Sequence, residues 1–171
     1  MSRFYALPLS IIAVLLLLLS AMPLFAAETG NEVDPAADAV LVKLHQSAAT
    51  ADWDSYFGLF AAEASFVGTD MTEHWHMQEF EQYARATQGW RYTRVNQTLT
   101  QVGDVVVFDE ILDHDKYGIS RGTGTLIRTA DGWKILQYHL SFPIPNKVAL
   151  RITEQIKFFR KQQKASTAVS Q

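Results

Sequence analysis

Four segments with strong β-propensity follow one another between Trp90 and Phe142, and a short turn joins each segment to the next. The turns contain glycine and aspartate, which are typical of tight hairpin connections. Strands joined in this way predict an antiparallel meander. The expected strands cover 90–99, 105–112, 119–128 and 133–142.

Helical patterns precede this meander. Ala37, Leu41 and Leu44 share one face at helical spacing. The expected elements are a helix from Pro35, a second helix after the N-cap Asp52, a strand over 64–67 and a third helix over 77–87. Helices followed by an antiparallel meander predict an α+β fold, a cone-shaped roll in which a curved antiparallel sheet wraps around the N-terminal helices. The mouth of such a cone is a favourable place for a pocket.

An extra helix is expected at the C-terminus. Pro143 and Pro145 end the last strand, and Asn146 caps a helix over 146–164. A loose tail over 165–171 follows. The helix is basic, so it either lies on anionic lipid or packs as a solvated face on the body or on a second copy.

The N-terminus has the organisation of a targeting segment. Arg3 precedes a long apolar run that ends in small residues. This pattern predicts a signal peptide over 1–27, and the run is also long enough to stay as a membrane anchor. The domain is therefore expected to be periplasmic or secreted, or anchored to the inner membrane, with membrane contact only if the segment is retained. A polar linker over 28–34 leads to one domain over 35–145.

Composition excludes several classes of protein. The formal charge of −3 shows no basic footprint for nucleic acid. The absence of cysteine excludes disulfides, thiolate nucleophiles and cysteine zinc sites. His74 and His76 share a face in an extended chain and could bind a metal with Glu73 or His139. Because no second ligand cluster accompanies them, no metal and no cofactor is predicted.

The last predicted strand carries polar residues at every second position, namely Gln137, His139 and Ser141. Side chains in a strand alternate between faces, so these three are expected to share a face with Trp133 and Ile135 and to line a cavity. His139 is the first candidate for a proton carrier or ligand anchor because histidine titrates near neutral pH. A structural histidine bonded to a loop is the alternative.

Two irregular segments are candidates for the rim of this pocket. The loop before the third helix carries Asp70, Glu73 and Trp75, and such loops commonly hold site residues. Asp70 is a candidate general base, with Glu73 and Trp75 as ligand contacts. Alternatively, Asp70 caps the turn and Trp75 plugs the cone. Tyr117 and Arg121 are expected to close over the mouth and hold an anionic ligand.

Two carboxylates interrupt the apolar strand over 105–112. Asp109 and Glu110 point to opposite faces, and the pattern leaves open which of them faces the pocket with Phe108. A carboxylate among apolar neighbours would have a raised pKa and could act as an acid or base, and Glu110 is the candidate. The alternative is an ion pair with Arg121 or Lys134 on a neighbouring strand.

Three stretches resemble a known family: ADWDSYFGLF at 51–60, FVGTDMTEHW at 66–75 and GWKILQYHLS at 132–141. Together with the order of elements, they are similar to the SnoaL-like branch of the nuclear transport factor 2-like superfamily over 34–145. The resemblance implies a cone-shaped α+β roll. The superfamily contains ketosteroid isomerases, polyketide cyclases, dehydratases, kinase association domains and members without known chemistry. Its enzymes use Asp, His or Tyr in the cone for acid/base chemistry.

Three functions stay open. The first is an exported domain that binds a small, mostly apolar molecule in the cone pocket. The second is an acid/base lyase or isomerase, similar to cyclases or dehydratases, that uses His139 with a pocket carboxylate. The third is an oligomerisation or interaction domain with a filled cone. A homodimer packed through the outer face of the sheet is expected, and the sequence alone does not say whether a reaction is catalysed.

Overall fold

The computed structural model describes residues 32–169. The predicted signal peptide and most of the linker over 28–34 lie outside the described residues, so export and anchoring stay predictions. The compact unit that carries the fold begins at Val33.

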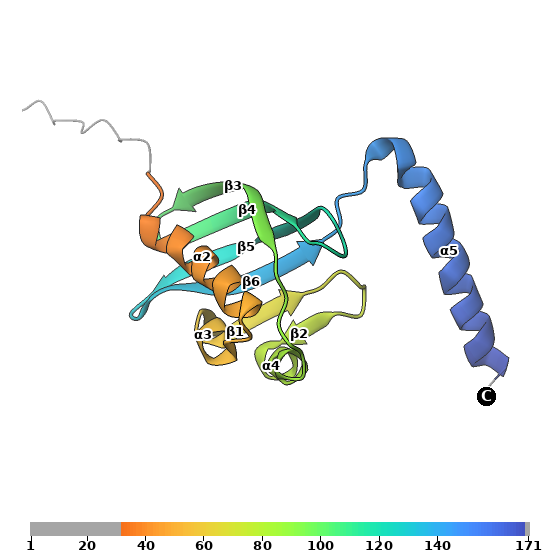
Figure 1. Ribbon diagram of the computed structural model, residues 1–171, viewed down its shortest axis with the longest axis horizontal. Coiled ribbons are helices and arrows are strands. Elements are labelled where there is room, and N and C mark those ends of the chain that lie inside the picture. The colour runs from red at the N-terminus through yellow and green to blue at the C-terminus, as the bar shows by residue number, and fades with distance from the viewer. Residues whose placement is uncertain (1–31, 170–171) are drawn as a thin grey trace, which may run out of the picture. The chain divides into compact units, whose positions relative to one another are not determined.

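The described elements follow the predicted order (Figure 1). The helices are α2 (Pro35–Ala49), α3 (Trp53–Phe57), α4 (Met77–Arg85) and α5 (Asn146–Val169). The strands are β1 (Phe60–Val67), β2 (His74–His76), β3 (Thr93–Val102), β4 (Val105–Asp113), β5 (Ser120–Thr129) and β6 (Gly132–Ser141). The main differences from the prediction before the meander are that β1 starts earlier and that a short strand β2 replaces part of the irregular turn before α4.

The strands form one curved sheet in the order β2-β1-β6-β5-β4-β3 (Figure 1). From β3 to β6 each strand pairs antiparallel with the next, so the predicted meander is confirmed. β1 lies parallel to β6, and β2 turns back antiparallel on β1. The predicted α+β roll is therefore confirmed, with the sheet extended by two strands beside β6.

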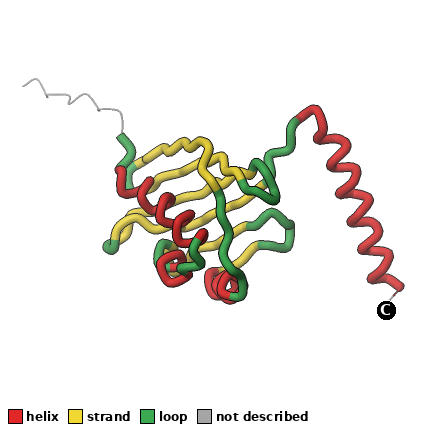
Figure 2. The backbone as a smooth tube through the Cα atoms, viewed as in Figure 1, coloured by secondary structure: helices red, strands yellow, loops and turns green. Residues whose placement is uncertain are grey.

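The helices α2, α3 and α4 pack together with the sheet to form the core. Contacts join α2 to β6 and α4 to β1, and Figure 2 shows the helices along one side of the curved strands. Leu41 of α2, Val106 of β4 and Ile135 of β6 are completely buried in this core. Burying each such side chain contributes about 1.5–3 kcal/mol, so the helical face predicted from spacing determines where α2 docks.

Gly124 allows two aromatic rings to pack over β5. It is paired with Phe108 on one side and with Tyr138 on the other, and the two ring centroids are 5.6 Å apart. A Cβ atom at this position would come within 2.6 Å of Cζ of Phe108, closer than non-bonded carbons approach. Only glycine leaves room for this crossing of rings.

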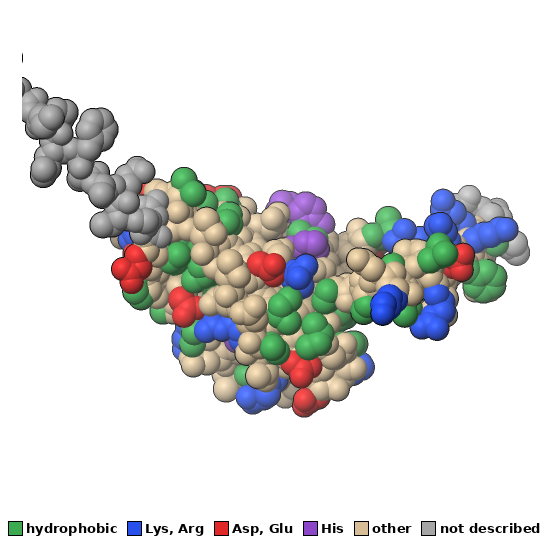
Figure 3. All heavy atoms as spheres, turned by 90° about the horizontal axis from the view of Figure 1, so that it is seen from above, with side chains coloured by type: hydrophobic (Ala, Val, Ile, Leu, Met, Phe, Trp, Pro, Cys, Tyr) green, Lys and Arg blue, Asp and Glu red, His purple; other side chains and the backbone are tan. Residues whose placement is uncertain are grey.

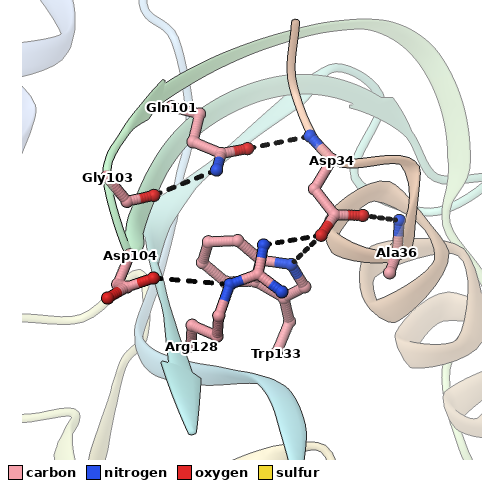
Figure 4. A network of polar contacts seen from close by, with 7 residues as sticks. All are labelled: Asp34, Ala36, Gln101, Gly103, Asp104, Arg128 and Trp133. Carbon is pink, nitrogen blue, oxygen red and sulfur yellow. Dashed lines mark hydrogen bonds and ion pairs between the residues drawn. The ribbon is translucent and has the colours of Figure 1, made fainter. Parts of the chain in front are cut away.

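A polar network fixes the start of α2 against the far ends of three strands (Figure 4). The Asp34 carboxylate accepts a hydrogen bond from the backbone N–H of Ala36, 2.9 Å away, and thereby caps the helix. It also accepts from Nε1 of Trp133 at 3.0 Å and from the guanidinium of Arg128 at 2.7 Å. Gln101 accepts from the backbone N–H of Asp34 at 2.8 Å. The three bonds to the carboxylate, that from Trp133 foremost, lower the pKa of Asp34 from 3.8 to about 2.

A β-bulge interrupts the regular alternation of β6. Ile135 pairs with Leu126 and Gln137 pairs with Thr125, so Leu136 is an extra residue without a partner across the ladder. The pairing of β6 with β1 shifts at the same place. A bulge of this kind moves every following side chain to the other face of the strand.

The bulge makes one prediction from the sequence wrong. Trp133 is buried before the bulge, and after it Tyr138 is buried. The three polar residues that were predicted to share the face of Trp133 therefore do not share it. They lie on the outer face of the sheet, away from the core. These residues are Gln137, His139 and Ser141, paired with Thr125, Thr123 and Arg121 of β5.

The helix α5 begins at the predicted Asn146 and continues past the predicted end at Lys164 to Val169. Its described side chains are mostly exposed, including Leu150, Phe158 and Phe159. Figure 3 shows basic side chains in blue beside hydrophobic ones in green along this helix. Among the described residues, no helix has the length and apolar character needed to cross a membrane.

Candidate functional site

A pocket of about 460 Å³ opens between α4, the neighbouring loops and the sheet. Aromatic side chains dominate its wall, as is typical of sites for small molecules. Between β1 and the end of α4, the lining residues are Phe66, Gly68, Thr69, Glu73, Trp75, Phe80, Tyr83 and Thr87. The others are Gly89, Trp90, Tyr92, His114, Lys116, Tyr117, Leu140 and Phe142.

The pocket has an exposed rim and a buried interior. At the rim, Tyr83, Tyr117 and Phe142 are 51%, 52% and 44% exposed. In the interior, Phe80 is 2% exposed and stacks on Phe66 with ring centroids 4.0 Å apart. The rings therefore form the wall of a hollow and do not fill the cone, which argues against the filled-cone alternative.

A buried polar triad lies behind the inner wall of the pocket. Glu110 of β4 is completely buried, and its Oε1 accepts a hydrogen bond from the hydroxyl of Tyr138 at 2.8 Å. The same oxygen lies 2.9 Å from Nε2 of His45, on α2, which donates to it. Helix α2, β4 and β6 thus each contribute one member, and their packing brings together residues far apart in the sequence.

Burial and charge both act on the tyrosines around Glu110. Burial raises the pKa of Tyr138 well above 10, and the nearby Glu110 carboxylate raises it further. Burial followed by the charge of Glu110 also raises the pKa of Tyr56. Both hydroxyls therefore stay protonated at neutral pH, and that of Tyr138 donates to Glu110. Oε2 of Glu110 is buried and has no hydrogen-bond partner among the described residues.

A second, much smaller cavity of about 20 Å³ adjoins the triad. His45, Tyr56 and Tyr138 contribute to its wall, and it shares wall residues such as Tyr92 and Leu140 with the large pocket. Its size suits a single water molecule, so the triad is close to the pocket but separated from it by side chains.

Three of the predicted ligand contacts line the pocket, namely Glu73, Trp75 and Tyr117. The open choice between the two carboxylates of β4 is resolved. Glu110 faces the interior, whereas Asp109 lies outside and forms an ion pair with Arg121 at 3.2 Å. The ion-pair alternative therefore describes Asp109, and Glu110 is the carboxylate that faces the interior.

Other predicted site residues lie elsewhere. His139, Gln137, Ser141 and Arg121 lie on the outer face of the sheet because of the bulge and the β5 register. Phe108 is a core residue, 4% exposed, behind the pocket. A mechanism that joins His139 to a carboxylate inside the cone has no support in this arrangement.

Asp70 is exposed and caps its own turn. Its Oδ1 accepts from the hydroxyl of Thr72 at 2.7 Å and from the Thr72 backbone N–H at 2.9 Å. These bonds lower the pKa of Asp70, which makes it a weaker base. Asp70 is not among the residues that line the pocket. The capping alternative therefore describes this residue better than the role of general base.

Two histidines of the site, His45 and His114, were not among the residues predicted from the sequence. The His45 side chain is only 15% exposed and bonds Glu110. His114 is half-buried and lines the large pocket between Tyr92 and Tyr117, with ring centroids 4.8 and 5.0 Å away. One signal for His45 was available, because it follows the buried Leu41 by four residues and therefore lies near the same face of α2.

A metal ion in a protein requires a cluster of ligating side chains. In the part of the chain from 32 to 169, no group of three or more metal-ligating side chains is close enough to hold an ion. His74 and His76 lie on the short strand β2, with ring centroids 6.4 Å apart.

The curved sheet, the covering helices and the pocket at the open end define the class of nuclear transport factor 2-like α+β cone proteins. Within this class, the model of the SnoaL-like domain matches residues 37–145. The chain therefore belongs to the SnoaL-like domain family, as its sequence motifs predicted. No curated protein matches the chain in sequence.

Solved structures share the fold at low sequence identity. A cystatin-like fold protein from Burkholderia xenovorans is 21% identical with a TM-score of 0.56, covering 63% of this chain and 90% of that chain. A candidate ketosteroid isomerase from Parabacteroides distasonis is 17% identical with a TM-score of 0.55, covering 69% and 94%. A candidate dehydratase from Streptomyces avermitilis is 14% identical with a TM-score of 0.55, covering 63% and 94%. At these identities the likeness concerns the fold alone.

Proposed function

We propose that this domain binds a small, mostly apolar molecule in the pocket between α4 and the sheet. The observation that supports it is a hollow of about 460 Å³ with an aromatic wall in the interior of the roll. Pockets of this size and composition bury most of the surface of a small ligand. The wall also offers polar groups, including His114 and Tyr92, that would orient such a molecule.

Binding of N-phenyl-1-naphthylamine, a neutral probe whose fluorescence rises in apolar surroundings, tests this proposal on the full chain. We expect one probe per protomer. Thr69 is exposed at the rim and lines the pocket, so T69W places an indole at the opening and should weaken binding about tenfold. The matched control T98W, on the exposed surface of β3, should bind as the wild type does. Equal binding by both variants would contradict the proposal, because the probe would then lie elsewhere.

A second candidate function is acid/base catalysis, now centred on Glu110. The buried carboxylate, held by Tyr138 and His45 next to the pocket, is the observation that favours it. Two of the similar structures are described as a candidate isomerase and a candidate dehydratase. As a base, Glu110 would remove a proton next to a carbonyl group, which requires the side chains between the small cavity and the large pocket to move aside.

Deuterium exchange at the carbon next to the carbonyl of 2-tetralone in D₂O tests this second function. Wild-type protein should accelerate the exchange and E110Q should not, since an amide cannot accept the proton. Y138F supplies a second variant if E110Q folds poorly. Exchange at the same rate with and without wild-type protein would rule out this function for Glu110.

A further inference from the structure

His114 presents a fixed hydrogen-bond donor on the rim of the pocket. Its Nδ1 accepts from the backbone N–H of Lys116 at 3.0 Å and of Tyr117 at 3.4 Å. Because Nδ1 accepts, the proton of the neutral ring is on Nε2. The backbone of the same turn is closed by a 2.7 Å bond from the N–H of Gly118 to the carbonyl of His114. The donor therefore belongs to a well-defined turn and not to a freely rotating side chain.

Lys116 adds a positive charge at the same rim. Its ammonium lies 4.9 Å from the centroid of the Tyr117 ring, and Lys116 is one of the residues that line the pocket. No ion pair joins it to a carboxylate within the described part of the chain, although the exposed Asp115 precedes it. A cation with this freedom can turn towards an anion at the opening.

The acidic residue of the pocket wall is already engaged. Oε2 of Glu73 accepts from the backbone N–H of Asp70 at 3.1 Å, which holds the carboxylate in its own loop. The same group lies directly against Gly68, where a Cβ atom would collide with it. Through Oε2, Glu73 thus supports the loop before Trp75. Among the lining residues, His114 and Lys116 offer nitrogen donors to an anion at the rim, and the hydroxyls of the wall can donate to it as well.

We infer that the ligand of this pocket carries a carboxylate, held at the rim by Nε2–H of His114 and the ammonium of Lys116. Its apolar part lies between Phe66, Phe80 and Trp90 in the interior. This inference rests on the proposed binding function and narrows it from apolar molecules to amphipathic acids. Charge-assisted hydrogen bonds of this kind are stronger than neutral ones, so they would select an acid over its neutral analogue.

Calorimetric titration of the full chain with three matched naphthalenes tests the inference: 2-naphthoate, 2-naphthamide and 2-naphthylmethylamine. The expected order of affinity is acid, amide, amine, with about fivefold between acid and amide. K116Q should lower the affinity for 2-naphthoate about fivefold and leave that for 2-naphthamide unchanged. K43Q, which removes a lysine of α2 outside the pocket, should change neither.

The outcomes separate this inference from the proposal on which it rests. Equal binding of all three compounds, or tightest binding of the amine, would overturn the inference and leave the apolar pocket intact. Binding of none of them would overturn the proposed function as well. Lys116 is exposed, so K116E should fold and should invert the preference from the acid to the amine. An unchanged preference in K116E would also overturn the inference.

Discussion

The hydrogen bond between Tyr138 and Glu110 should stabilise the fold measurably, and Y138F removes it with little change in shape. The bond is 2.8 Å long, Tyr138 is 4% exposed and Glu110 is completely buried. A hydrogen bond to a carboxylate contributes about 1.5–3 kcal/mol, and its loss leaves the acid with His45 alone. We therefore expect the free energy of unfolding to fall by about 2 kcal/mol.

Urea denaturation followed by circular dichroism measures this loss. A decrease of about 2 kcal/mol corresponds to a drop in Tm of about 6 °C for a domain of this size. The matched control is Y83F, because Tyr83 is 51% exposed at the rim and its hydroxyl is accessible to water. Y83F should change the free energy of unfolding by less than about 0.5 kcal/mol.

A double-mutant cycle with E110Q assigns the loss to this pair. The coupling energy between Y138F and E110Q should exceed about 1 kcal/mol, because the residues are in direct contact. If Y138F costs no more than Y83F, or if the two changes are additive, the triad does not stabilise the core and our reading of it is wrong.

Three further predictions concern the fold and its outer face. D34N should lose stability at neutral pH. The pKa of Asp34 is about 2 in the folded protein, against 3.8 for an ordinary aspartate, so its contribution to stability is present above pH 4 and is lost as the pH falls towards 2. The urea denaturation curves of D34N and wild type should therefore converge near pH 2. Curves that stay apart at that pH would contradict this reasoning. G124A should cost about 2 kcal/mol by forcing β5 away from the ring of Phe108, and a neutral result in thermal melts would contradict that packing. The predicted homodimer would bury exposed apolar residues of the outer sheet face such as Val107, which is 48% exposed. V107K should therefore be monomeric in light scattering. A monomeric wild type would refute the dimer.

Most of the fold could be predicted from the sequence because local patterns report local structure. The spacing of Leu41 and Leu44 identified the buried face of α2, and the turns around Gly103 and Gly132 identified hairpins. The motif at 66–75 also identified Trp75 and Glu73 as pocket residues. These signals depend on residues close together in the chain, where periodicity is reliable.

The site itself depended on registers that the sequence does not display. In the sequence around Leu136, nothing marks a break in the alternation of inward and outward side chains. The extra residue that turns His139 outward is visible only in the pairing of β6 with β5 and β1. The choice between Asp109 and Glu110 required knowing which face of β4 meets α2. The spacing of α2 places His45 near the buried face, but its partner Glu110 lies 65 residues away in the sequence, so the hydrogen bond between them follows only from the tertiary fold.

Intermolecular nuclear Overhauser effects between the protein and bound 2-naphthoate test the central claim most directly, namely that the functional face of the sheet is the concave one. We expect contacts from the naphthalene protons to Phe66, Trp90 and Tyr92, all in the pocket wall. Contacts to Gln137 and His139 on the outer face, with none to these rings, would contradict it.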